Sequence, residues 1–347
     1  MDTIDAATLF HQYQRYLSMT DPLRYSCTPT AVQASGNIFG MDFETLFSIP
    51  PNQQAAWFIR QQEQADLLRQ AMAGHAVSSE NFVRAFGFSL DQLRQSQTQL
   101  DPIRHSIPDK LVVLTFDDAF RDQYELAVPI LNEYGFHATF FVTEMPDSPR
   151  GPGFQDKNRY MTWDQITDLA AQGFELGNHT KNHLFGLHTM DRDIFLREIH
   201  AMEEDFTSHG LPKPISFAYP SGTANGEAAS FVRECGYRWA RGNCETGVCG
   251  MRGMSTYVPE VDSPLALPSF GDPDFYSEAL MRSRIALAAN GNILGLTYHS
   301  VSPDTWPGSC SFARQMELLA QSGCTVLSVR DLEHYIDPVK ADLWNPI

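Results

Sequence analysis

Between Lys110 and Val329, short apolar runs alternate with helix-like segments. The run Leu111–Phe116 is almost wholly apolar, as expected of a strand that is buried on both faces. A helix-like stretch that ends at Gly135 follows it, and His137–Val142 is a second strand-like run. Further strand-like runs cover residues 174–177, 215–219, 236–240, 292–299 and 325–329. This alternation predicts an α/β fold with a parallel sheet and a barrel-like closure.

The first hundred or so residues follow a different pattern. Residues 52–72 are rich in Gln, Ala and Leu and predict a helix after Pro50 and Pro51, and residues 80–100 predict one or two more. The region has no strong strand pattern and no cluster of reactive residues. We therefore expect a mainly helical N-terminal extension over residues 1–105 and a barrel domain over residues 106–340.

Charge and hydropathy restrict the partners and the location. The formal net charge of -17 argues against nucleic acid and against acidic membrane surfaces, which would repel the chain. The first twenty residues are polar and acidic where a secretory signal needs an apolar run, and no stretch approaches the ~18 apolar residues of a membrane span. The six cysteines are scattered, as reduced thiols usually are. These features predict a cytoplasmic protein with no nucleic-acid or membrane partner.

Two polar clusters stand where strands are predicted to end, which is where parallel barrels collect reactive groups. Asp117 and Asp118 repel each other, and a metal ion that binds one leaves the other free as a base. The alternative is a solvated turn in which an Asp caps the next helix. His179 and His183, four residues apart, can point at one cation. Two histidines and one carboxylate leave positions open for water and substrate, which is typical of a catalytic metal site.

Two further strand ends carry polar residues. The turn at 217–222 contains Tyr219 and Ser221, and its Pro-Ser-Gly sequence can present backbone N–H groups to a substrate. By itself the same turn could be a plain strand exit. His299 ends another apolar run, where a lone histidine is usually structural. Beside a metal site it becomes a candidate general acid.

The order and spacing of these clusters resemble the polysaccharide deacetylase family, also called the NodB-homology family. Thr115–Asp118 and His179–His183 match its T-F-D-D and H-[ST]-x-x-H elements in full. Pro220 and Gly222 keep the frame of its R-x-P-Y-G element, and His299 matches its late L-x-x-H element. The paired match of the first two elements is the specific part of the resemblance.

The resemblance covers roughly residues 108–338 and implies a distorted (β/α) barrel of the NodB-homology type. The family's ligands for zinc, or for a similar ion such as cobalt, nickel or manganese, correspond to Asp118, His179 and His183. Asp117 would be the general base and His299 the general acid. The backbone N–H of Ser221 would help to hold the oxyanion, and Tyr219 lies in the same oxyanion or substrate turn.

The chain departs from the family pattern at several positions. The arginine that often orients the base would stand at Ala218, so Asp117 must be held differently. The usual Tyr slot is occupied by Ser221, and Ala119 replaces the common Gly after the two aspartates. The fourth sequence block has no convincing match in residues 241–274. Candidates in and beside that region are Trp239, Asp262 and Asp272.

Taken together, the motifs predict a metal-dependent hydrolase that removes an N-acyl group, most often N-acetyl, from an amino sugar or a related small amide. A homo-oligomer is compatible with the sequence. One alternative is an allantoinase-like or other C–N hydrolase of the same superfamily. Another is a non-catalytic binding protein on the same fold, although such a protein has no physical need to keep Asp117 and His299 beside a metal triad. An Asp117→Asn variant distinguishes them, because only an enzyme would lose turnover.

Overall fold

The computed structural model describes residues 101–145, 153–243, 256–259, 262–271, 273, 276–301 and 309–344, together with residues 37–38, 41–42, 67 and 78. Most of the extension expected over residues 1–105 therefore lies outside the described residues, and its mainly helical character stays a prediction. Within it, β1 (Asn37–Ile38) and β2 (Met41–Asp42) pair in an antiparallel ladder that the sequence analysis did not predict.

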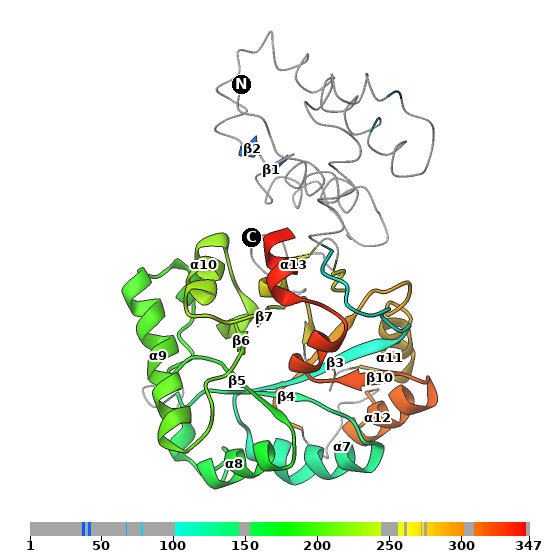
Figure 1. Ribbon diagram of the computed structural model, residues 1–347. Helices are drawn as coiled ribbons and strands as arrows, with labels where there is room; N and C mark the ends of the chain where they lie inside the picture. The colour runs from blue at the N-terminus through cyan, green and yellow to red at the C-terminus, as the bar shows by residue number, and fades with distance from the viewer. Residues whose placement is uncertain are drawn as a thin grey trace.

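One curled sheet of parallel strands organises the described part of the chain from residue 101 onward (Figure 1). Its strands are β3 (Leu111–Asp117), β4 (Thr139–Val142), β5 (Glu175–Asn178), β6 (Ser216–Ala218), β7 (Trp239–Arg241), β8 (Phe270–Gly271), β9 (Leu294–Tyr298) and β10 (Thr325–Leu327). The order is β7-β6-β5-β4-β3-β9-β8, with β10 paired to β3 outside that path. All pairings in this sheet are parallel, as predicted.

The strand β3 is central because three strands pair with it. Along one edge it pairs with β9 over Val112–Phe116. On its other edge, β10 pairs with the first half (Leu111–Val113) and β4 with the second half (Thr115–Asp117). All seven residues of β3 are buried, which confirms the prediction of a strand buried on both faces.

The sheet curls until its two edges are joined. A single parallel bridge links Arg241 at the end of β7 to Leu267, just ahead of β8. The N–H of Leu267 donates to the carbonyl of Ala240 at 2.8 Å, and the N–H of Gly242 donates to the carbonyl of Leu267 at 3.0 Å. This contact completes a distorted parallel barrel and agrees with the predicted (β/α) barrel class.

Helices cover the outside of the barrel, and in Figure 1 α9, α8, α7 and α12 follow one another round the strands. The helices are α7 (Val128–Tyr134), α8 (Trp163–Ala171), α9 (Arg192–Ser208), α10 (Gly226–Glu234), α11 (Glu278–Ile285), α12 (Phe312–Gln321) and α13 (Pro338–Trp344). The short turns are η1 (Gln123–Ala127), η2 (Gly153–Gln155), η3 (Leu187–Thr189), η4 (Pro220–Gly222), η5 (Pro264–Ala266) and η7 (Arg330–His334). The predicted stop at Gly135 is confirmed, since this residue ends α7 with φ 63°.

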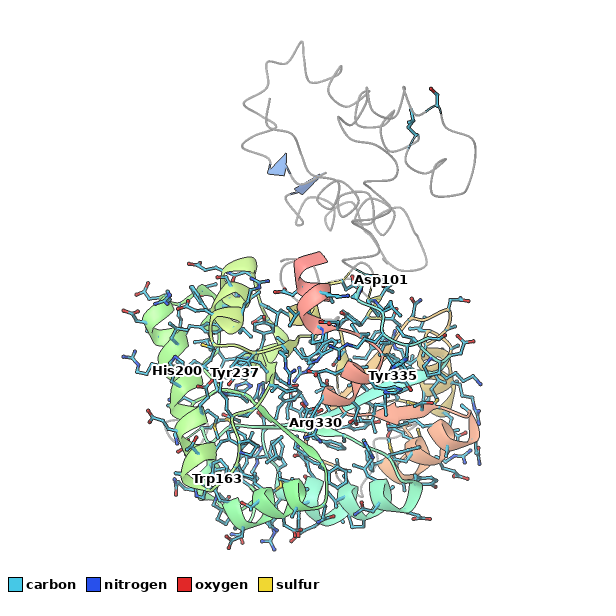
Figure 2. All side chains as sticks on the ribbon, in the orientation of Figure 1. Asp101, Trp163, His200, Tyr237, Arg330 and Tyr335 are labelled. Carbon is cyan, nitrogen blue, oxygen red and sulfur yellow. The ribbon has the colours of Figure 1, made fainter. Side chains whose placement is uncertain are left out.

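Side chains fill both faces of the curled sheet (Figure 2), and alternate residues of β3 belong to different cores. The residues that pack outward beneath the helices are Val112, Leu114 and Phe116. Leu111 and Val113 belong to the core inside the barrel. Because side chains on a strand repeat with a period of two, Thr115 and Asp117 also face the interior. The interior face of β3 therefore ends in a carboxylate.

Seven of the eight strands of this sheet lie within a few residues of the runs predicted from the sequence. The eighth, β8, was not predicted, because its two residues are too few to show a period. Among the described cysteines, Cys235, Cys310 and Cys324 are free thiols. In the part of the chain that the structure describes, every helix is too short or too polar to cross a bilayer.

Candidate metal and catalytic site

Five strand ends bring the candidate site residues together, four of which were predicted from the sequence. Strand alternation places Asp117, the last residue of β3, and Arg241, the last residue of β7, on the interior face. His179 directly follows β5, Ser221 lies in the turn after β6, and His299 directly follows β9. All five positions are at the carboxyl ends of parallel strands, where barrel enzymes place their reactive groups.

The predicted ligands Asp118, His179 and His183 converge. One ligand atom from each lies within 4.8 Å of the other two, and no other group of His, Cys, Asp or Glu does so among the described residues. The Nε2 atoms of His179 and His183 lie 3.7 Å and 3.8 Å from Oδ1 of Asp118. Ligand atoms that share a tetrahedral ion at ~2.1 Å stand roughly 3.4 Å apart, so these separations are close to those of a bound metal.

The surroundings of His179 suit a metal ligand. Its Nδ1 donates to the carbonyl of Ala218 at 2.8 Å, which leaves the lone pair of Nε2 facing Asp118. That Nε2 and Oδ1 of Asp118 are both buried without a hydrogen-bond partner in the described chain. Burial lowers the pKa of His179 to about 3 and so keeps the ring neutral, and burial raises the pKa of Asp118. Buried acceptors that face each other in this way fit a cation.

Left-handed backbone aims the ligands at the site. Asp118 (φ 69°) and Ala119 (φ 55°) turn the chain at once after β3. In extended backbone Asp118 would point to the face opposite Asp117. Thr180 (φ 66°) and His183 (φ 49°) turn the histidine loop in the same way. Such backbone is strained for residues other than glycine and collects at functional sites. Here two of the candidate ligands adopt it, and Thr180 directly follows the third.

A second layer of polar residues holds the histidine loop in shape. Glu198 of α9 accepts from the backbone N–H and from the side-chain amide of Asn182, both at 2.8 Å. Lys181 donates to Asp205 of α9 at 2.6 Å and also pairs with Glu144 beyond β4. The residues between the two histidines are therefore fastened to a long helix, which fixes the spacing of the ligands.

Asp117 has an arginine partner that comes from a neighbouring strand. Nη2 of Arg241 lies 2.5 Å from both carboxylate oxygens of Asp117, and both side chains are 4% exposed. Ala218, where the arginine was expected and is absent, is the register partner of Arg241 in the β6–β7 ladder. The two positions therefore lie at the same height on the interior face. Arg241 was not predicted as a site residue, although a charged residue at the end of a buried strand was a signal for it.

The charges round Asp117 keep it ionised. Burial alone would raise the pKa of Asp117, but the charge of Arg241 and the hydrogen bonds that it donates outweigh burial and lower the pKa overall. Nε2 of His179 lies 3.6 Å from Oδ2 of Asp117, and Nε2 of His299 lies 3.9 Å from the same oxygen. His299 is 39% exposed, so a solvent-accessible imidazole and a buried carboxylate stand side by side.

The turn after β6 places its two predicted residues differently. Ser221 has φ 58°, and its Oγ is buried without a hydrogen-bond partner among the described residues. Tyr219 is fully buried, its hydroxyl donates to the carbonyl of Leu265 at 3.0 Å, and its N–H donates to the carbonyl of Arg241 at 3.0 Å. Both donors of Tyr219 are thus engaged inside the fold. The geometry assigns Tyr219 to the core rather than to the oxyanion or substrate site.

Two of the three candidates for the fourth sequence block have other contacts inside the fold. Trp239 is fully buried inside the barrel, where its ring lies 6.1 Å from that of Tyr257. Asp262 accepts from the backbone N–H of Val258 at 2.7 Å and so braces its own loop. Asp272 lies outside the described residues.

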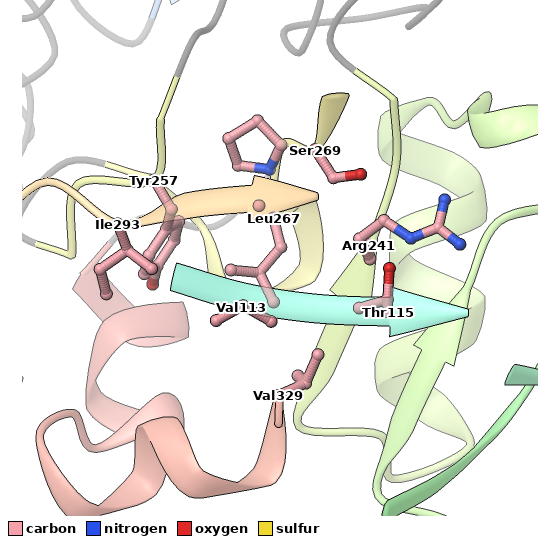
Figure 3. Close-up of a pocket in the computed structure, with 10 residues that line it drawn as sticks. Val113, Thr115, Arg241, Tyr257, Leu267, Ser269, Ile293 and Val329 are labelled. Carbon is pink, nitrogen blue, oxygen red and sulfur yellow. The ribbon is translucent and has the colours of Figure 1, made fainter. Parts of the chain in front are cut away.

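A small cavity lies inside the barrel beside the ion pair (Figure 3). Arg241 and Thr115 line its polar side, where Oγ1 of Thr115 stands 2.8 Å from Oγ1 of Thr297. The apolar lining residues are Val113, Leu267, Pro268, Ile293 and Val329. The cavity therefore adjoins the Arg241 side of the ion pair, and most of its lining is apolar.

The family model described as polysaccharide deacetylase matches residues 104–240, and this match confirms the resemblance inferred from the motifs. The peptidoglycan-N-acetylglucosamine deacetylase of Bacillus cereus is 28% identical over 133 residues, 38% of this chain and 55% of that protein. The poly-beta-1,6-N-acetyl-D-glucosamine N-deacetylase of Escherichia coli K12 is 26% identical over 184 residues, 43% of this chain and 27% of that protein. The chain thus spans about half or less of the length of these curated relatives.

Similar chains also occur among solved structures. A CE4 family pseudoenzyme from Bacillus anthracis is 15% identical, and the alignment covers 66% of this chain and 66% of that chain with a TM-score of 0.44. A family 4 carbohydrate esterase from Streptomyces lividans, in complex with acetate, is 18% identical. That alignment covers 64% of this chain and 93% of that chain with a TM-score of 0.42. Likenesses at this distance do not bear on function.

Proposed function

We propose that this chain, whose residues 104–240 belong to the polysaccharide deacetylase family, is a metal-dependent hydrolase that removes an N-acetyl group from an N-acetylated carbohydrate. The observation that carries the proposal is the convergence of Asp118, His179 and His183 beside the Asp117–Arg241 pair. Three protein ligands leave positions open for water and substrate, whereas a structural site closes its coordination with protein atoms.

The proposed ligands of the ion are Asp118, His179 and His183. Two imidazoles and one carboxylate suit zinc, and also cobalt, nickel or manganese. The fit rests on the buried Nε2 of His179 and the buried Oδ1 of Asp118, neither of which has a hydrogen-bond partner among the described residues. A divalent ion held there supplies a Lewis acid that polarises an acyl carbonyl and lowers the pKa of a water.

The proposed general base is Asp117, which is ionised and which Arg241 holds in one orientation. It takes a proton from the water whose oxygen attacks the acyl carbon. His299, 3.9 Å from Asp117, is the proposed general acid. It gives a proton to the amine nitrogen as the C–N bond breaks and acetate leaves, a role that commonly contributes ~100-fold to 10,000-fold. The backbone N–H of Ser221 is the proposed donor to the oxyanion.

The proposed substrate class is an N-acetylated amino sugar, free or in an oligosaccharide. It is supported by the two curated relatives, which are named for deacetylation of peptidoglycan N-acetylglucosamine and of poly-beta-1,6-N-acetyl-D-glucosamine. Because the chain spans only 55% and 27% of those proteins, their polymers are not carried over to it. A small-amide substrate, a homo-oligomer and a cytoplasmic location stay predictions. The net charge of -17 continues to argue against nucleic acid as a partner.

A non-catalytic binding protein is the second candidate from a different class. The buried ion pair of Asp117 argues against it, because an unused carboxylate in the barrel is costly to desolvate. Asp117→Asn distinguishes the two, since an enzyme would lose turnover and keep its metal, whereas a binding protein would keep its affinity. The comparisons give the allantoinase-like alternative no support.

The direct test combines metal analysis with a release assay. The full chain is purified, its bound metals are measured, and acetate release is followed from N-acetylglucosamine, its oligomers and small N-acetyl amides with added zinc, cobalt, nickel or manganese. We expect about one ion per chain and release that His179→Ala abolishes. Val339→Ala, which changes an exposed residue of α13, is the control that should leave release unchanged. A chain that binds no metal and releases no acetate from any substrate would refute the proposal.

A further inference from the structure

A buried glutamine joins the two strand ends that carry the proposed base and acid. Gln123 is fully buried and begins η1, a π-helical turn. Its Nε2 donates to the backbone carbonyl of Asp117 at 2.5 Å and to that of His299 at 2.8 Å. Only the NH₂ end of an amide can meet two carbonyl oxygens, so the orientation of the side chain is fixed.

This contact begins where the strand ladder stops. The last pair of the β3–β9 ladder is Phe116 with Tyr298, and the next residues are Asp117 and His299. Beyond that pair, the amide of Gln123 takes over the connection between the two chains. The neighbouring Asp122 carboxylate accepts from the hydroxyl of Ser300. Hydrogen bonds from the start of η1 therefore hold both His299 and Ser300, the two residues that follow β9.

The two ends of the amide are used differently. Oε1 of Gln123 is buried and has no hydrogen-bond partner in the described chain. That acceptor costs free energy, whereas the NH₂ end donates to two backbone carbonyls that an apolar side chain of the same length would leave without this donor. The contribution of Gln123 therefore lies in the connection that its NH₂ end makes between the two strand ends. π-Helical turns such as η1 are frequent at functional sites.

We propose that Gln123 is a positioning residue that sets the separation of the general base Asp117 and the general acid His299. It acts through their backbones and does not touch substrate. One rigid amide fixes both carbonyls, so the two side chains keep the 3.9 Å approach from Nε2 of His299 to Oδ2 of Asp117. Small errors in such an approach are costly to the rate. The inference rests on the proposed function.

The chain offers a matched control in Gln315 of α12. This residue is also fully buried, and its Nε2 also donates to two backbone carbonyls, those of Pro273 at 2.8 Å and Cys310 at 3.0 Å. Its Oε1 also accepts from the hydroxyl of Tyr298 in β9 at 2.6 Å, and Tyr298 belongs to the outer core. The contacts of Gln315 therefore lie in the core beneath α12 rather than at the site. A methionine at either position removes both donors and preserves length and packing.

The test compares Gln123→Met and Gln315→Met in the full chain with metal added, and it measures kcat, KM, bound metal and Tm. We expect Gln123→Met to lower kcat by about 10-fold to 100-fold with KM and bound metal little changed. We expect Gln315→Met to lower Tm at least as much but kcat by less than about threefold. Gln123→Asn, which keeps the amide but is too short to span both carbonyls, should resemble Gln123→Met and serves if that variant does not fold.

A double-mutant cycle in kcat distinguishes a positioning role of Gln123 from a purely structural one. If Gln123 acts by placing His299, then Gln123→Met should cost less than about threefold in kcat once His299 is already alanine. An equal cost in both backgrounds, or a loss of kcat no larger than that of Gln315→Met, overturns the inference. A wild-type chain that releases no acetate with any metal overturns the proposed function instead, and the two failures are thereby distinguished.

Discussion

Replacing Arg241 by methionine should destabilise the fold through Asp117. The variant keeps an apolar stem but removes the Nη2 that lies 2.5 Å from both carboxylate oxygens. Because both side chains are 4% exposed, the carboxylate would be left as a buried charge without its counter-charge. Removal of one partner from a buried ion pair costs ~3–5 kcal/mol. For a domain of this size that loss corresponds to a fall in Tm of roughly 6–20 °C.

The assay is a double-mutant cycle by chemical unfolding of the wild type, Arg241→Met, Asp117→Asn and the double variant. The double variant has no unpaired charge, so it should recover ~1–3 kcal/mol relative to the sum of the single losses. Arg238→Met is the matched control, because Arg238 is 41% exposed and pairs with Glu333 at 3.0 Å. That surface change should cost only ~0–1 kcal/mol. Single losses that simply add would refute the coupling of Arg241 to Asp117.

Catalysis gives an independent readout of the same pair. Arg241→Met should lower acetate release by about 100-fold or more, because Asp117 would lose its fixed orientation. Since Ala218 is the register partner of Arg241, the double variant Ala218→Arg/Arg241→Ala should bring a guanidinium back to Asp117 from the adjacent strand and recover part of the activity. Full release by Arg241→Met would show that the base does not need this arginine.

Three further predictions concern the metal, the strained turn and acid stability. Removal of bound metal from the wild type by a chelator should lower the free energy of unfolding, and zinc at ~100 times its Kd should restore ~2.7 kcal/mol. The His179→Ala variant should show no such response to chelator or zinc in thermal unfolding. Ala119→Gly should gain between zero and about 1 kcal/mol in urea unfolding, because Ala119 has φ 55°, and a loss would contradict the assigned strain. Burial would raise the pKa of Asp331, but hydrogen bonds from Ser328 and His137 lower it overall, so its stabilisation is present above the unfolded pKa of 3.8 and is lost as pH falls below it. Asp331→Asn should therefore cost ~1 kcal/mol at neutral pH and progressively less as pH falls below 3.8, and a cost that does not fall with pH would contradict this sign.

Local sequence patterns were sufficient to locate the strands and the three candidate ligands that converge in the structure. Leu111–Phe116 reads as a buried strand because every residue is apolar or small, and the carboxylates that follow must lie at its carboxyl end. The order of strand ends along a parallel barrel then brings Asp118, His179 and His183 to one edge without further information. Those residues lie near one another because each follows the carboxyl end of a strand, and these ends lie at one end of the barrel.

The features that the sequence did not yield depend on contacts between distant segments. Tyr219 stands in the expected turn, but strand alternation and the carbonyl of Leu265 draw its side chain into the core. Barrel closure depends on the single bridge from Arg241 to Leu267, which has no local signature. The role of Gln123 likewise appears only once β3 and β9 are known to be neighbours.

The apparent loss of the orienting arginine has a geometric explanation. Neighbouring strands lie ~4.8 Å apart, and register partners on a barrel face the same side. An arginine side chain is longer than that spacing, so it can reach the same carboxylate from either of two adjacent strands. The sequence motif lacks an arginine at Ala218, whereas in the barrel interior Arg241 supplies the guanidinium that pairs with Asp117. Since both positions share one buried space, an arginine at either requires a small residue at the other, and Ala218 with no exposed surface meets that requirement.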